Sequence, residues 1–146
     1  MRPDVIDLPP SAGLPALFLL CVLIGAMVLE HFRGRSRARA AEERAQVLLK
    51  QWLSPAQLAQ YQKYGHFEVT GCHSSKRYRI RQTHQMNMDE LDEQGARTVA
   101  WCFGPEGDLP MGDVMLAQKI ALENDELAAL AVANRGNPQR SPPRFG

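Results

Sequence analysis

The sequence predicts an α+β protein with a single N-terminal transmembrane helix, a juxtamembrane helix, and a small antiparallel β-meander packed with a C-terminal helix. Three observations predict this class: a long apolar run near the N-terminus, apolar residues at helical spacing after it, and a change to alternating residues after Gly65. The chain has 146 residues and a formal net charge of +1. It is therefore long enough for one modest domain, and any basic surface must be local.

The apolar run is "AGLPALFLLCVLIGAMVL", residues 12–29, which contains no charged side chain. A helix of about 20 residues crosses the hydrocarbon core of a bilayer, so we expect a transmembrane helix over residues 12–32, preceded by a flank at residues 1–11. A cleaved signal peptide would have a basic N-terminal region and a small-residue cleavage site, which this segment lacks. A buried helix that is apolar on every side would need a larger core than this chain supplies.

Four arginines follow the span at alternate positions: Arg33, Arg35, Arg37 and Arg39. Only Arg2 precedes the span, so the positive-inside rule places the N-terminus outside and the C-terminal part in the cytoplasm. We interpret the four arginines as the stop signal of the membrane anchor, in contact with the anionic headgroups of the lipid bilayer. Nucleic acid is a disfavoured partner for them, because no aromatic residues interleave with the arginines.

The juxtamembrane segment, residues 33–53, carries apolar residues at alternating spacings of three and four, which predicts a helix with heptad character. The stripe consists of Ala38, Ala41, Ala45, Leu48 and Trp52. We favour docking of this stripe on the protein's own domain. Self-association as a homo-oligomer stays open, because small residues at positions 21 and 25 permit close approach of a second helix in the membrane.

A cytoplasmic α+β domain is predicted over residues 54–134. Ser54, Pro55 and Gln57 are start signals for a short helix that Gly65 can end. Four alternating segments then predict three or four strands: "HFEVT", "KRYRIR", "HQMNMDEL" and "RTVAWCF". Asp113 is expected to cap a covering helix, and whether "ENDE" at 123–126 breaks that helix is left open. The Pro-rich residues 135–146 are predicted to be a disordered tail.

The second half of the chain contains a run of short motifs: "GHFEVTG", "RYRIR", "MNMDELDEQG", "WCF" and "GDVMLAQKIALENDELAALAVANR". In these motifs it resembles a set of small uncharacterised bacterial proteins. The resemblance implies a bacterial origin and a compact unit, and it carries over no activity and no functional residues. Together with the anchor, it predicts a single-pass protein of a bacterial inner membrane.

Candidate binding chemistry in the domain centres on three arginines. Arg77, Arg79 and Arg81 alternate along one predicted strand, so they share a sheet face that can hold an anion. Pairing with acidic neighbours across the strands is the favoured alternative. Those acidic neighbours are Asp89, Glu90, Asp92 and Glu93. The other residues expected on this face are Glu68, Asn87, Asp89, Thr98 and Cys102, of which Cys102 is a candidate redox thiol.

Metal and catalytic sites are not predicted. Cys72, His73, His84 and Cys102 are ligand types that suit zinc, but no pair has the usual two-to-four-residue spacing. No nucleophile, acid and base follow a recognised order, and "GPEGDLPMG" is not a phosphate-binding glycine loop. We therefore expect no enzyme activity, no metal and no cofactor.

The expected function is that of an accessory or adaptor subunit of a larger membrane complex, acting through protein–protein contacts. A single span with no polar residue before Glu30 cannot form a transport path by itself, whereas an anchor confines the domain beside membrane partners. The alternative is a membrane-tethered regulator whose basic sheet face binds an anionic ligand or nucleic acid. A thiol-based redox sensor, with Cys102 as its reactive residue, is a third hypothesis.

Overall fold

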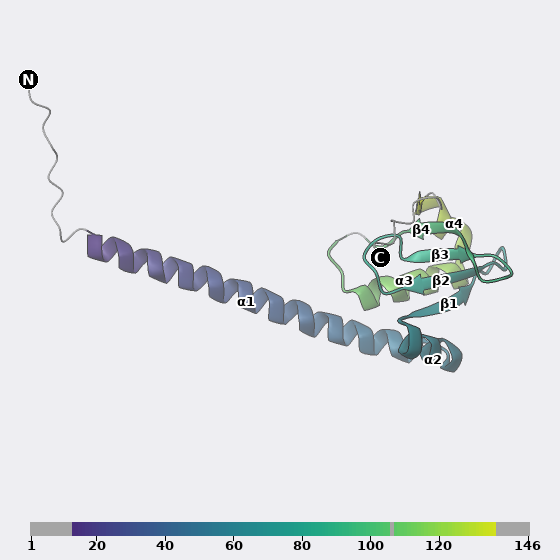
Figure 1. Ribbon diagram of the computed structural model, residues 1–146, viewed down its shortest axis with the longest axis horizontal. Helices are drawn as coiled ribbons and strands as arrows, with labels where there is room; N and C mark the ends of the chain where they lie inside the picture. The colour runs from purple at the N-terminus through teal and green to yellow at the C-terminus, as the bar shows by residue number, and fades with distance from the viewer. Residues whose placement is uncertain (1–12, 106, 137–146) are drawn as a thin grey trace, which may run out of the picture. The chain divides into compact units, whose positions relative to one another are not determined.

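The computed structural model describes residues 13–105 and 107–136 (Figure 1). The chain divides into two units, Met1–Ala40 and Ala41–Gly146. Helix α1, Gly13–Trp52, contributes to both units. The predicted span and the predicted juxtamembrane helix are thus parts of one helix, while the flank at residues 1–11 lies outside the described residues.

In the first unit, every residue of α1 from Leu17 to Ala40 is exposed. Pro15 falls in the first turn of α1, where a missing N–H removes no helical hydrogen bond. The exposed residues up to Phe32 include most of the large apolar side chains of the helix. This helix is long and apolar enough to be a candidate membrane-spanning helix.

The second unit contains a five-stranded antiparallel sheet in the order β1-β2-β3-β4-β5 (Figure 1). The strands are β1 His66–Thr70, β2 Arg77–Arg81, β3 Met88–Leu91, β4 Arg97–Cys102 and β5 Asn134–Gly136, and the helices are α2 Pro55–Tyr64, α3 Met111–Asn124 and α4 Glu126–Val132. The α+β class is confirmed. Strand β5 was not anticipated, because Arg135 and Gly136 belong to the segment predicted as a tail; residues 137–146 lie outside the described residues.

The core lies on one face of this sheet. Alternation along β1 and β2 points Phe67, Tyr78 and Ile80 to the same side, where all three are fully buried. They pack with residues of the helices and of the next strand: Leu49, Leu53, Tyr61, Met88, Met115 and Leu122. The opposite face of the sheet therefore receives the alternate residues of β1 and β2, which are charged or polar.

The end of α1 docks on the domain, but with a different helical face from the predicted one. Ala45 is buried as expected, whereas Leu48 and Trp52 are 41 % and 59 % exposed. Leu49 and Leu53 are buried in their place. Helix α3 approaches this docked face closely, since a Cβ at Gly112 would lie 2.6 Å from the carbonyl carbon of Ala45. The buried residues Ala45, Leu49 and Leu53 recur every four residues, so they form one face of the helical turn instead of the predicted stripe.

Two polar residues of α1 reinforce the docked face. Glu42 accepts a hydrogen bond from the backbone N–H of Met111, the first residue of α3, at 2.7 Å. Gln46 accepts one from the Tyr61 hydroxyl at 2.5 Å. Since helix N-termini carry unpaired N–H groups, Glu42 satisfies a donor that the helix itself cannot.

The helix ends follow the predicted signals in most places. Ser54 and Gln57 form the capping box of α2, and Gly65 ends it with a left-handed φ of 68°. The segment at 123–126 does break the C-terminal helix: α3 ends at Asn124, and Asp125 caps α4. Asp113 lies in the first turn of α3 and does not cap it, because the helix begins two residues earlier.

Candidate functional site

The arginine collar, which consists of Arg33, Arg35, Arg37 and Arg39, surrounds α1 directly after its apolar part. Successive helical residues are about 100° apart, so the first and third arginines lie on one side and the second and fourth near the opposite side. All four side chains are exposed, and Arg33 lies 3.6 Å from the Glu30 carboxylate. A helix that lies along nucleic acid or flat on a surface would place its cations on one side. Cations on two opposite sides suit a helix that passes through a layer of lipid headgroups.

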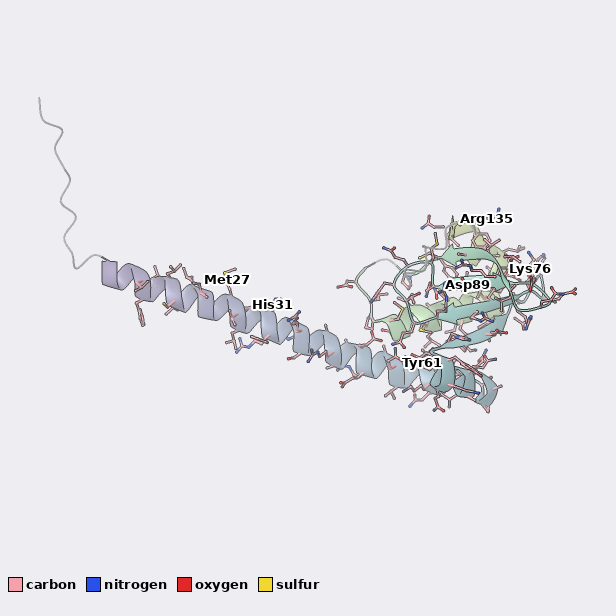
Figure 2. All side chains as sticks on the ribbon, in the orientation of Figure 1. Met27, His31, Tyr61, Lys76, Asp89 and Arg135 are labelled. Carbon is pink, nitrogen blue, oxygen red and sulfur yellow. The ribbon has the colours of Figure 1, made fainter. Side chains whose placement is uncertain are left out.

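The apolar residues before the arginine collar are distributed on all sides of α1. Every residue from Leu17 to Leu29 is exposed, and the Met27 side chain projects from α1 in Figure 2. A helix that packs on a soluble domain needs one apolar stripe, whereas a membrane span is apolar on all sides. This segment has the second pattern.

The arginine face is the sheet surface opposite the core, and it consists of Arg77, Arg79, Arg81 and Arg97 with the carboxylates of Glu68 and Asp89. Glu68 lies 2.9 Å from Arg79 and 3.5 Å from Arg77. Asp89, labelled within the sheet in Figure 2, lies 3.0 Å from Arg81 and 3.8 Å from Arg97. Each carboxylate thus contacts two guanidinium groups.

Backbone carbonyl groups hold the same arginines in place. Arg77 donates to the carbonyl of Asp92 at 2.9 Å, and Arg81 donates to that of Met86 at 2.8 Å. Of the acidic partners considered from the sequence, Asp89 contacts the arginines through its carboxylate. Glu90 points to the core side, where Lys76 and the Trp101 indole contact it. These contacts favour pairing of the arginines with carboxylates of the same sheet over binding of an outside anion. The four guanidinium groups still outnumber the two carboxylates.

Asn87 does not belong to the arginine face, contrary to the expectation from alternation. It is 2 % exposed, and its amide exchanges two hydrogen bonds with Gln118 of α3, at 2.7 and 2.9 Å. Strand β3 begins only at Met88, and Met86 has a positive φ of 45°. Because the chain is not extended before Met88, the two-residue period does not apply to Asn87.

The Glu126 cluster is a buried polar site that the sequence did not reveal. The Glu126 carboxylate accepts hydrogen bonds from the backbone N–H groups of His73 and Ser74, at 2.8 and 2.7 Å, and from the Ser74 hydroxyl. The Tyr78 hydroxyl donates to it at 2.6 Å. A Cβ at Gly71 would lie 2.5 Å from a carboxylate oxygen, so this site also requires that glycine. The cluster ties the β1–β2 loop to the start of α4.

Hydrogen bonding decides the ionisation of this cluster. Burial of Glu126 opposes its charged form, but hydrogen bonds from Ser74, Tyr78 and the backbone outweigh burial and lower its pKa to about 2. Burial and the hydrogen bond to Glu126 raise the pKa of Tyr78 well above its usual value of 10.0. The carboxylate is therefore ionised at neutral pH and serves as an acceptor for the loop. A buried carboxylate that accepts all these hydrogen bonds stabilises the fold. In the sequence, Glu126 stood out only as the last residue of "ENDE".

The four residue positions considered as zinc ligands fall into two separate places. His84 and Cys102 line one cavity of about 200 Å³, beside the buried Asn87. Cys72 and His73 lie in the β1–β2 loop. Among residues 13–105 and 107–136, no group of three metal-ligating side chains comes together. All three cysteines have free thiols, and Cys102 is partly buried.

The Trp52 groove is an open groove of about 630 Å³ in the second unit. On one wall, Gln57 and Gln60 of α2 hydrogen-bond the backbone carbonyl and N–H of Glu68, at 2.9 and 3.0 Å. On the other wall, Lys119 and Glu123 of α3 form an ion pair at 2.5 Å. The remaining lining residues are Trp52, Leu53, Ser54, Ala56 and Thr70.

No protein-family model, no curated protein and no solved structure matches this chain. Residue roles therefore cannot be transferred from a relative. Three features of the described residues bear on function. They are the exposed apolar segment of α1 with the arginine collar that follows it, the arginine face, and the Trp52 groove.

Proposed function

We propose that this chain is a single-pass protein of a bacterial inner membrane that acts as a non-enzymatic accessory or adaptor subunit of a larger complex. In this proposal α1 spans the bilayer up to about Phe32, with the N-terminus outside and the α+β domain in the cytoplasm. One observation carries it: α1 exposes apolar residues on all sides and then, immediately afterwards, arginines on two opposite sides.

The surface of the domain supports a docking role. Trp52 is exposed at an open groove, and exposed tryptophans are frequent anchors in protein–protein interfaces. The most strongly shifted carboxylate, that of Glu126, is buried and holds a loop, so its chemistry is not offered to a substrate. Confinement to the membrane raises the effective concentration of such a domain beside its partners.

The test is purification of the full-length chain, with a C-terminal tag, from gently solubilised native membranes, followed by mass spectrometry of the co-purifying chains. We expect a stoichiometric membrane complex. Recovery only as a free monomer would overturn the adaptor function. A variant with Leu23 and Ile24 replaced by arginine should leave the membrane fraction, because charged residues are costly at the centre of a span.

The excess of guanidinium groups over carboxylates on the arginine face favours one alternative function: a membrane-tethered regulator that binds an anionic ligand or nucleic acid. In that case, salt-sensitive binding should depend on Arg77, Arg79 and Arg81 while membrane insertion does not. The purification distinguishes the two, since a regulator would be recovered with nucleic acid or a small anion and without a stoichiometric partner.

A further inference from the structure

We propose that the Trp52 groove docks a basic segment of a partner membrane protein, a segment that flanks one of the partner's spans on the cytoplasmic side. The inference rests on the proposed membrane-anchored adaptor function, and it names the docking surface and the chemistry of the partner. Three properties of the groove lead to it: the elements that form it, the charge that is accessible in it, and the hydrogen bonds already made by the strand edge at Glu68.

The groove is built from four elements of the second unit. It combines the end of α1, the first turns of α2, strand β1 and the second half of α3. Its volume of about 630 Å³ falls within the range of about 300–1,000 Å³ that is typical of binding sites. Trp52 lines the groove and is more than half exposed, while the next residue, Leu53, is buried in the core and fixes the position of the turn. The groove is thus a firmly supported site with an aromatic side chain at its mouth.

The accessible charge in the groove is negative. In the ion pair on α3, the Lys119 side chain is 11 % exposed and the Glu123 side chain is 36 % exposed. An approaching segment therefore meets the carboxylate before the ammonium. The Trp52 indole adds a ring face that attracts cations. A lysine or arginine is favoured by both groups, whereas an acidic side chain is repelled by Glu123.

At Glu68, the strand edge in the groove has no free backbone groups for an added strand. Gln57 and Gln60 already satisfy the outward carbonyl and N–H of Glu68 on β1. A partner must therefore bind through its side chains, which makes charge and apolar contact the basis of recognition. Cytoplasmic flanks of membrane proteins are rich in lysine and arginine, and a tethered domain meets them at high effective concentration.

The test uses the full-length chain in its native membranes, with a photo-cross-linking amino acid at one of two exposed helical alanines. Ala56 lines the groove, and Ala131 of α4 is the matched control outside it. Cross-linked peptides are identified by mass spectrometry. We expect the probe at Ala56, and not the probe at Ala131, to capture a segment rich in lysine or arginine that adjoins a span of another membrane protein.

Substitutions in the groove test the chemistry of the contact. Glu123→Gln and Trp52→Ala should each lower the yield from the Ala56 probe by about fivefold or more. Trp52→Phe should retain most of the yield, because an aromatic face remains. Glu43→Gln, at an exposed carboxylate of α1 outside the groove, should have no effect. Unchanged thermal unfolding of each variant excludes loss of the fold.

Each other outcome overturns a defined part of the proposal. Capture of the arginine collar of a second copy would replace the partner protein by self-association. Capture of an acidic or uncharged segment would overturn the charge assignment. If the purified complex is intact but the Ala56 probe captures nothing, docking does not use the groove and the adaptor function survives. If the chain is a free monomer and the probe captures nothing, both proposals fail.

Discussion

Each of the two units contains a set of four arginines, and the two sets have opposite surroundings. The arginine collar lies on a helix whose residues 17–40 are all exposed, so its cations face the environment on two opposite sides of the helix. The arginine face lies on a sheet, where Glu68 and Asp89 contact all four guanidinium groups. A cluster of arginines in the sequence therefore does not by itself indicate a binding site. The contacts that each arginine makes within the protein indicate whether its charge is available to an outside partner.

The largest effect is expected from the collar. Replacing its four arginines with glutamine removes the charge bias across the span, so a large fraction of chains should insert in the reverse orientation or fail to insert. Reporter fusions at the C-terminus, active on only one side of the membrane, measure the orientation. The matched control replaces the four arginines of the arginine face with glutamine, which should leave the orientation unchanged. A C-terminus that stays cytoplasmic in the collar variant would contradict the role of the collar as a stop signal.

The next effect concerns the stability of the domain. Glu126→Ala removes the acceptor of the Ser74 and Tyr78 hydroxyls and of two backbone N–H groups, so the buried Tyr78 hydroxyl and the partly buried loop donors lose their partner. We expect a loss of about 3–5 kcal/mol in the free energy of unfolding. Urea unfolding of the full-length chain in detergent, followed by tryptophan fluorescence, measures it. Glu43→Ala, at an exposed position, should stay within about 0.5 kcal/mol of wild type.

The same carboxylate predicts a pH dependence. Its pKa is about 2 in the folded chain against an ordinary value of 4.5, so folding favours the ionised form. The resulting stability is fully present above pH 4.5 and is lost as the pH falls toward 2, and it amounts to about 3 kcal/mol. Unfolding measured between these pH values should show this loss in wild type and not in Glu126→Ala. Equal pH dependence in both proteins would show that another group titrates.

A smaller effect on stability is expected from the arginine face. Replacing Arg77, Arg79 and Arg81 with glutamine leaves Glu68 and Asp89 without most of their cationic contacts. Because the arginines are partly exposed and screened by solvent, the cost should be about 2 kcal/mol. Binding of inorganic phosphate or of a single-stranded oligonucleotide should be weak in both wild type and variant. Salt-sensitive binding that the variant loses would instead favour the tethered regulator.

Short sequence patterns predicted the helix and strands whose conformation is determined by residues close together in the sequence. The capping box and the terminal glycine gave the bounds of α2, and strict alternation gave β1, β2 and β4. These signals succeed because caps and the strand period are set by the residues of the element itself. The same alternation placed the three arginines on one face and identified Asp89 as a partner.

Features that depend on distant residues were not predictable from the sequence. The docked face of α1, which buries Ala45 and Leu49, lies against Gly112, more than sixty residues away in the sequence. The Glu126 carboxylate likewise finds its donors in a loop around position 74. In both cases a tertiary contact overrides a local pattern, because packing has room for only one arrangement. Strand β5 is three residues long, too short to show alternation.

The smallest effect concerns the thiols, and it tests the redox hypothesis for Cys102. Cys72 is exposed and accepts a hydrogen bond from the backbone N–H of Glu126 at 3.5 Å, whereas Cys102 is partly buried. Accessibility therefore favours Cys72, and we expect a neutral alkylating reagent to modify it severalfold faster at pH 7. Single variants Cys72→Ala and Cys102→Ala, both on a Cys21→Ala background, measure each rate separately. Faster alkylation of Cys102 would show that its surroundings activate the thiol despite its burial, and the redox-sensor hypothesis would then regain support.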